Sequence, residues 1–280
     1  MKVPFTKMHG IGNDYIYINC FREKIDDPSA LSVAMSPRHF SVGSDGLVLI
    51  CPSETADAKM RMFNADGSEG NMCGNAIRCV GKYLYEHGIC HKTDLTIETK
   101  SGIKNLTLFP DTEDEITAVK VYMGKAETTP GKIPVLSDHP MIAEPVAVNG
   151  KIYHLTAVSM GNPHAVCFDL APAGLDLEKM GPFFEHHPLF PDRVNTEFAR
   201  VIEPHTIEMR VWERGSGETF ACGTGACATV AAAVICGLSP AEEPITVRLR
   251  GGELTVTYSR NGDVFMTGAA TEVYEGVYRI

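Results

Sequence analysis

The fold of this chain is decided by two matching stretches, CGNAIRCVGKYL at residues 73–84 and CGTGACATVAAA at residues 222–233. Their first residues, Cys73 and Cys222, are separated by 222 − 73 = 149 residues, a separation that we call the repeat offset. The same offset relates four further pairs, which are Gly12-Asn13 and Gly161-Asn162, Phe63 and Trp212, Glu69 and Glu218, and Gly88 and Gly237. Matches at one fixed offset indicate tandem duplication of a domain.

Each stretch predicts a helix that begins just after its cysteine. Apolar or small residues recur with the i, i+3, i+4, i+7 spacing of one helix face. These residues are Ile77, Val80, Gly81 and Leu84 in the first half and Ala226, Thr229, Val230 and Ala233 in the second. Gly88 and Gly237 stand where a helix C-terminus favours a residue with positive φ.

Alternating apolar residues predict strands before and after each helix. The expected strands are residues 15–19, 47–50, 95–99, 165–168, 206–212, 245–249 and 254–258. We therefore expect an α/β (α+β) protein with two pseudo-symmetric domains, each a β-sheet around a central helix. The predicted boundaries are 1–127 for the half with Cys73, 128–150 for a Pro-rich connection, and 151–280 for the half with Cys222. The last strand is free to pack back on the first half.

Composition excludes several classes of protein. The net charge is −10, which disfavours nucleic acid and anionic membranes as partners, because both are bound by clustered Lys and Arg. No stretch approaches the roughly 20 apolar residues of a membrane helix, and residues 1–12 lack the apolar core of a signal peptide. The nine cysteines contain no C-x-x-C pair, so we expect reduced thiols in the cytoplasm and neither a disulfide framework nor a zinc site.

The repeated cysteines suit acid–base chemistry. A cysteine at a helix N-terminus is expected to have a lowered thiol pKa, and the glycines that follow, Gly74 and Gly223, leave backbone N–H groups open to a carboxylate. Two such thiols on opposite sides of a carbon atom can invert a stereocentre, since one removes the α-proton and the other supplies a proton. The other seven cysteines are interpreted as packing residues. Gly223-Thr224-Gly225 alone is weak evidence for a phosphate site. The paired motifs at residues 72–79 and 221–227 contain no lysine, which argues against Schiff-base chemistry through pyridoxal phosphate.

The motifs around both cysteines resemble the signatures of the diaminopimelate epimerase family. The resemblance is carried by residues 63–69 (FNADGSE) with 72–79 (MCGNAIRC), and by residues 212–219 (WERGSGET) with 221–227 (ACGTGAC). Residues 9–14, 38–40, 161–164 and 193–195 also fit, so the resemblance runs from about Lys7 to about Gly268. It implies two pseudo-symmetric domains, each a mainly antiparallel sheet wrapped around a central helix. It also implies interconversion of LL- and meso-2,6-diaminopimelate in lysine and peptidoglycan-precursor synthesis.

The resemblance also assigns roles to individual residues. Cys73 and Cys222 would be the acid–base pair, with no metal and no organic cofactor. Backbone N–H groups of Gly74, Asn75, Gly223 and Thr224 would hold the reacting carboxylate. The distal end of the substrate would be held by Asn13, Asn64, Asn162, Asn195, Glu213 and Arg214. His164 and Glu213 would tune the protonation of the two thiols.

Two segments depart from the family pattern. Some relatives place a glutamine near the substrate where this chain has Ser44-Asp45-Gly46, so no contact is assigned there. Many relatives have Asn-Gly where this chain has Asn75-Ala76, and because Ala is favoured inside helices we expect no loss of activity.

Three alternatives remain open at this point. The nearest is a proline racemase or hydroxyproline epimerase, although those proteins typically carry His where this chain has Asn75. The second is an isomerase of the same fold that has lost its cysteines, but both are present here. The third is a thiol protein that senses oxidation or binds metal, which would leave Asn64, Asn195 and Arg214 without a role. The family resemblance further suggests a homodimer.

Overall fold

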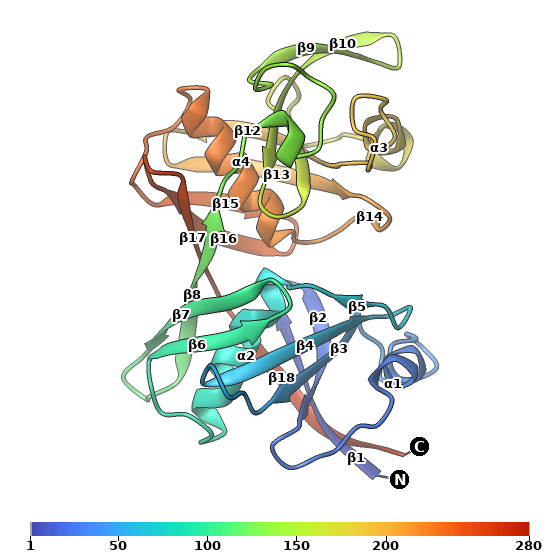
Figure 1. The fold of residues 1–280 in the computed structure, drawn as a ribbon, viewed down its shortest axis with the longest axis vertical. Helices are drawn as coiled ribbons and strands as arrows, with labels where there is room; N and C mark the ends of the chain where they lie inside the picture. Colours follow the sequence, from blue (N-terminus) through green and yellow to red (C-terminus); the bar gives the residue numbers. More distant parts are fainter. Residues whose placement is uncertain (1, 280) are drawn as a thin grey trace. The chain divides into compact units, whose positions relative to one another are not determined.

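The computed structural model describes residues 2–279, which fold as two compact units (Figure 1). The first unit is formed by the chain up to Val121 together with the chain from Thr267 onward, and the second is formed by Tyr122–Met266. The chain therefore passes from one unit to the other at two places, between 121 and 122 and between 266 and 267. The second unit is an insertion within the first.

The first unit is a mixed sheet. Its strands are β1 (Lys2–Gly10), β2 (Asn13–Asn19), β3 (Gly46–Cys51), β4 (Ala58–Asn64), β5 (Glu69–Gly70), β6 (Asp94–Thr99), β7 (Gly102–Pro110) and β18 (Thr271–Arg279), together with β8 (Ile116–Lys125), which continues past Val121 into the second unit. Neighbouring strands follow the order β18-β1-β2-β3-β4-β6-β7-β8, and β5 pairs with β4. The β2–β3 and β4–β6 pairs are parallel, and the other pairs are antiparallel.

The second unit repeats this plan. Its strands are β9 (Glu144–Val148), β10 (Lys151–Ser159), β11 (Pro163–Cys167), β12 (Asn195–Glu203), β13 (Thr206–Glu213), β14 (Gly217–Glu218), β15 (Ile245–Leu249) and β16 (Gly252–Tyr258), together with β17 (Asp263–Gly268), which continues past Met266 into the first unit. The order β9-β10-β11-β12-β13-β15-β16 has parallel pairs at β11–β12 and β13–β15. These pairs are the counterparts of β2–β3 and β4–β6.

The register of the two sheets confirms the internal repeat within the described chain. Tyr17 pairs with Val48 in the first unit, and Val166 pairs with Glu197 in the second. Both members of the second pair are displaced by the repeat offset from those of the first. One ion pair is also repeated, because Arg61 Nε donates to Glu69 over 2.8 Å and Arg210 Nε donates to Glu218 over 2.7 Å. The expected pseudo-symmetric fold is therefore present.

Each unit encloses one long helix. Helix α2 (Gly74–Glu86) and helix α4 (Gly223–Ile235) begin at positions related by the repeat offset, and each buries ten of its thirteen residues. Figure 1 shows the strands of each unit curving around its own helix. A helix that is covered on almost every side needs small or apolar side chains all round, and the Ala-rich sequence of α4 satisfies that requirement.

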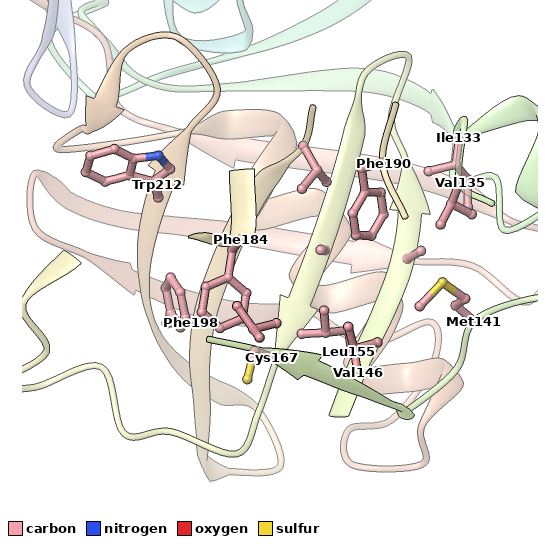
Figure 2. Packing of buried hydrophobic residues seen from close by; sticks show 14 of the residues in the cluster. Ile133, Val135, Met141, Val146, Leu155, Cys167, Phe184, Phe190, Phe198 and Trp212 are labelled. Carbon is pink, nitrogen blue, oxygen red and sulfur yellow. The ribbon is translucent and has the colours of Figure 1, made fainter. Parts of the chain in front are cut away.

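Two shorter helices cover the cores. Helix α1 (Pro28–Met35) packs on the first unit, where Leu31 and Met35 join a core cluster that includes Phe63. Helix α3 (Leu177–Glu185) begins one repeat offset after α1, is its counterpart, and contributes Phe184 to the second core. Figure 2 shows Phe184 next to Phe198, and their rings meet edge-on with centroids 5.1 Å apart.

The sequence-based boundaries need one correction. Residues 128–150 were expected to be a connection, but they contain a short 3-10 helix, η1 (Pro130–Lys132), and strand β9, and they belong to the second unit. Ile133, Val135, Met141 and Val146 are buried in its core. Proline and the absence of a clear period hid this packing in the sequence. Among residues 2–279, no helix is both long and apolar enough to span a bilayer.

Candidate active site

In the first unit, Cys73 caps the N-terminus of α2. Its backbone is extended, with φ −133° and ψ 122°, and its Sγ atom accepts a hydrogen bond from Ala76 N over 3.5 Å. The thiol is half-buried and contacts Asn13 Oδ1 over 3.3 Å. The sulfur therefore lies where helix N–H groups and the helix dipole favour a negative charge.

Asn13, at the start of β2, is held in place by an acidic side chain. Its Nδ2 donates to Asp45 Oδ2 over 2.7 Å, and Asp45 is in turn bound by Arg38 over 3.1 Å. Because Nδ2 is engaged by a carboxylate, Oδ1 of Asn13 is directed toward Cys73 and toward Asn75 Nδ2, which lies 3.5 Å away. Asp45 is thus the residue that orients the amide beside the first thiol.

In the second unit, Cys222 caps α4 in the same way. Its Sγ accepts from Gly225 N over 3.3 Å and lies 3.5 Å from Thr224 Oγ1. The Thr224 hydroxyl accepts from Asn162 Nδ2 over 3.3 Å, and Asn162 Oδ1 lies 3.0 Å from His164 Nε2. The second thiol is therefore connected to His164 through Thr224 and Asn162.

Glu213 lies beside the second thiol at the end of β13. The Cys222 thiol and the Thr219 hydroxyl both hydrogen-bond to its carboxylate. Burial raises the pKa of Glu213 above its usual value, although these two bonds act in the opposite sense. Glu213 is therefore a neighbour of Cys222, and its role in tuning the two thiols stays a prediction.

The expectation of a lowered pKa fails for Cys222. Burial raises the pKa of its thiol well above the ordinary value, and the carboxylates of Glu213 and Glu197 raise it further. The hydrogen bonds from Thr224 and Gly225 at the helix terminus oppose this shift but do not overcome it. Sequence could place Cys222 at a helix start, but it could not show two carboxylates near a buried sulfur. Cys222 is therefore protonated at neutral pH in this arrangement.

Two of the residues expected to bind the distal end of the substrate, Asn195 and Arg214, contact each other within the second unit. Asn195 is buried at the start of β12 and orients the next turn, since its Oδ1 accepts from Arg214 N over 3.0 Å. The Arg214 guanidinium donates to Asp192 O over 2.9 Å. Asn64, in the first unit, is exposed and donates to Ser68 Oγ over 2.9 Å. Gly74 and Gly223 are the first residues of their helices and are buried.

Three carboxylates that support the site were not identified from sequence. They are Asp45 behind Asn13, Glu197 behind His164, and Glu185, which accepts from Trp212 Nε1 over 2.8 Å and from Gly215 N over 2.9 Å. Glu185 fixes the turn after β13 that carries Arg214. The internal repeat could have identified Glu197, because the repeat offset aligns this acidic residue with the apolar Val48 of the first half.

Possible metal ligands lie elsewhere. Among residues 2–279, one group has the spacing to hold an ion, formed by His87 at the end of α2 with Glu272 and Glu275 of β18. His87 Nε2 already contacts Glu272 over 2.9 Å. Neither Cys73 nor Cys222 belongs to this group.

Solved structures identify the class of fold. The chain is similar to a hydroxyproline epimerase from Agrobacterium vitis, with a TM-score of 0.72, 15% identity, and coverage of 99% of this chain and 92% of that chain. A probable proline racemase from Agrobacterium radiobacter gives a TM-score of 0.73 at 15% identity, with the same coverage. A phenazine biosynthesis protein of the PhzF family from Bacillus anthracis gives 0.70 at 17% identity, with complete coverage of both chains. These similarities, at 15–17% identity, show the fold of the chain.

The sequence comparisons identify the family. The model for diaminopimelate epimerase matches residues 5–129 and 156–273. The diaminopimelate epimerase of Agathobacter rectalis is 52% identical over 98% of both chains, and that of Acetivibrio thermocellus is 54% identical over 97% of both chains. That of Methanococcus maripaludis is 50% identical over 98% of this chain and 99% of its own. The chain belongs to the diaminopimelate epimerase family.

Proposed function

We propose that this protein interconverts LL-2,6-diaminopimelate and meso-2,6-diaminopimelate, with Cys73 and Cys222 as the acid–base pair and no cofactor. The observation that carries the proposal is about 50% identity over nearly the whole chain to proteins named for that reaction. The structure supports it with two thiols that cap equivalent helices and that both contact polar side chains. Lysine and peptidoglycan-precursor synthesis is the pathway we propose.

The protonation of Cys222 suggests the order of events. Cys222 holds its proton because burial and two carboxylates raise its pKa, so it is the acid of the resting protein. Cys73 acts as the base and takes the α-proton of the substrate as its thiolate becomes a thiol. The carbanion then takes the proton of Cys222, which leaves Cys222 as the thiolate. The reverse reaction uses the same groups in exchanged roles.

The helix N-termini are proposed to stabilise the charge that develops. Backbone N–H groups of Gly74 and Asn75, and of Gly223 and Thr224, hold the reacting carboxylate by the anion-binding property of helix starts. His164 and Glu213 tune the protonation of the dyad. Glu213 does so directly, because its carboxylate is among the causes of the raised Cys222 pKa.

The distal end of the substrate is proposed to bind Asn13, Asn64, Asn162, Asn195, Glu213 and Arg214. Arg214 offers a planar fork to the distal carboxylate, and Glu213 accepts from the distal ammonium. Asn195 and Glu185 support this role, because they bind the backbone of Arg214 and Gly215 and fix the turn. A substrate without a distal amino-acid group would leave these polar groups unpaired and would be rejected.

We further propose a cytoplasmic homodimer. The odd number of cysteines, nine, fits a reducing compartment better than a disulfide framework. Strand β18 exposes Val273, Tyr274 and Val277, which are 54%, 44% and 56% exposed, and apolar side chains gathered on one strand are typical of an interface. Sedimentation velocity of the wild-type protein and of Val277→Lys tests the assembly.

The function is tested by proton NMR with LL-2,6-diaminopimelate in D₂O. We expect deuterium at one α-carbon together with formation of the meso isomer, and loss of both in Cys73→Ser and Cys222→Ser. Cys90→Ser and Cys236→Ser are matched controls, because both thiols are half-buried and lie outside the two helix N-termini. Both controls should retain exchange.

Two outcomes would contradict the proposal in different ways. Exchange with proline or hydroxyproline but not with diaminopimelate would keep the two-thiol mechanism and replace the substrate. No exchange with any of these amino acids by reduced protein would remove the epimerase function itself.

A further inference from the structure

Glu197 occupies a position in β12 that the first unit gives to a valine. Val48 pairs with Tyr17 and Met62, and Glu197 pairs with Val166 and Val211, each displaced by the repeat offset. His164 is likewise the counterpart of Tyr15, since 164 − 149 = 15. The two halves therefore share backbone and register here but differ in chemistry.

The buried carboxylate is costly to the fold. The side chains of Glu197 and His164 are both 0% exposed, and Glu197 Oε1 lies 2.7 Å from His164 Nδ1. Glu197 Oε2 has no hydrogen-bond partner among the described residues. An ionised group with an unpartnered oxygen is destabilising when buried, and the first unit shows that valine fills the same place. Packing alone therefore does not explain Glu197.

The hydrogen bonds around His164 run in one direction. Nδ1 faces a carboxylate oxygen, and Nε2 faces Asn162 Oδ1. Both partners accept, so both ring nitrogens carry a proton when Glu197 is ionised. Asn162 then donates through Nδ2 to Thr224, whose own hydroxyl proton is left for Cys222 Sγ. Each group in this series donates to the next one toward the sulfur.

We propose that Glu197 is a positioning residue: it keeps His164 doubly protonated and so fixes Asn162 and Thr224 with a donor directed at the Cys222 sulfur. This inference rests on the proposed function of Cys222. Without the carboxylate, a neutral His164 carries only one ring proton, and when that proton is on Nδ1 the lone pair of Nε2 faces Asn162. The Asn162 amide then turns, the Thr224 hydroxyl donates to Asn162 instead, and the Cys222 thiolate loses a hydrogen bond when it forms.

The first unit meets the same need by a shorter route. Asn13, the counterpart of Asn162, is oriented directly by the carboxylate of Asp45. In the second unit the residue equivalent to Asp45 is Val194, since 45 + 149 = 194. The second unit lacks a carboxylate at that position, and Glu197 orients the amide through His164 instead.

The charge balance of the site makes the effect specific. The charged groups that face His164 and Cys222 are Glu197 from β12 and Glu213 from β13. Glu197→Gln removes one negative charge and, with it, the second proton of His164. The net charge beside Cys222 is then unchanged, and the remaining difference is the direction of the hydrogen bonds.

The first test is ¹⁵N NMR of the histidine rings at pH 7, with His164→Gln used to assign the signal. In the wild-type protein we expect the two ring nitrogens of His164 to resonate close together, as in an imidazolium. In Glu197→Gln and in Glu197→Val, the residue of the first unit, we expect them to separate widely, as in a neutral ring. Unchanged His164 signals in both variants would overturn the proposal, and this readout does not depend on catalysis.

The second test measures kcat and KM separately for the Glu197 variants. We expect Glu197→Gln to lower kcat by roughly tenfold to hundredfold, with KM changed by less than about threefold, because Asn162 is the one proposed substrate-binding residue that turns. Glu218→Gln is the control: Glu218 also binds a cation in the second unit, Arg210 over 2.7 Å, but this ion pair is separate from the series leading to Cys222. Its kcat should stay within about twofold of wild type.

The two tests separate this proposal from the proposed function. Neutral His164 in the variants with wild-type kcat would show that the proton on His164 does not serve Cys222, which overturns the inference and leaves the epimerase intact. A wild-type protein without epimerase activity would overturn the proposed function, while the NMR comparison would still decide how Glu197 acts on His164. If Glu197→Gln failed to fold, Glu197→Val would carry both tests, because the first unit already accommodates valine there.

Discussion

Gly225→Ala changes one hydrogen into a methyl group at the most crowded point beside Cys222. A Cβ atom at this position would lie 2.7 Å from Glu197 Oε1 and 3.2 Å from Cys222 Sγ. Glu197 can shift only by disturbing its bond to His164, because its side chain is fully buried. The equivalent positions of the first unit are occupied by Ala76 and Val48, so the residue that corresponds to Glu197 there is a valine.

The magnitude follows from two opposing effects. Replacement of Gly by Ala inside a helix stabilises by about 1 kcal/mol. Overpacking a close-packed site costs about 1–3 kcal/mol. We therefore expect Gly225→Ala to lower the free energy of unfolding of the second unit by roughly 0–2 kcal/mol. Activity should fall by about tenfold or more, since displacement of Glu197 or Cys222 disturbs the acid.

The assay uses the single tryptophan of the chain. Trp212 is buried in the core of the second unit, so its fluorescence during urea denaturation reports on that unit. The double variant Glu197→Val/Gly225→Ala copies the pair found in the first unit and should regain stability relative to Gly225→Ala. We expect the double-mutant cycle to give a coupling of about 1–2 kcal/mol.

Two results would contradict crowding at position 225. If Gly225→Ala alone stabilises the second unit by about 1 kcal/mol and retains full activity, the site has room for a methyl group. Zero coupling between positions 197 and 225 would refute the claim that Glu197 causes the crowding.

Three further predictions concern the same unit. Iodoacetamide modification of Cys222 should be slow at pH 7 and still rising at pH 9, because burial raises its pKa; a plateau below pH 8 would contradict this. Burial opposes ionisation of Glu185, but hydrogen bonds from Trp212 and Gly215 hold the pKa of its carboxyl below the usual 4.5. The contribution of Glu185 to the stability of the second unit is therefore full above that pH and is lost as the pH falls below it. In Glu185→Gln, the free energy of unfolding followed by Trp212 fluorescence should depend less on pH in this acidic range. Arg214→Lys should raise KM for diaminopimelate by about tenfold or more, with a smaller effect on kcat.

The internal repeat made much of the fold predictable. The offset between Cys73 and Cys222 located both central helices, and alternation of apolar residues located most of the strands. Helix periodicity and strand alternation depend on local sequence, which is why these features could be read directly. Segment 128–150 was misjudged because its burial depends on residues distant in sequence rather than on any local period.

The electrostatics of the site were not predictable in the same way. Glu185, Glu197 and Asp45 are ordinary acidic residues in the sequence, and most such residues are solvated. Glu197 reaches His164 because β12 lies beside β11, a pairing between strands that are distant in sequence. For the same reason the pKa of Cys222 was expected to fall and instead rises, since the helix terminus is a local feature and the two carboxylates are not.

The insertion of one unit within the other has a consequence for synthesis on the ribosome. The second unit is contiguous, Tyr122–Met266, and all of its strands exist before β18 has been translated. The first unit begins earlier but is completed later, because β1 pairs along its length with β18. The domain made first therefore waits for its last strand, with one edge of β1 unpaired while the nascent chain elongates. Truncation before Thr271 should release a folded second unit beside a first unit that binds chaperones.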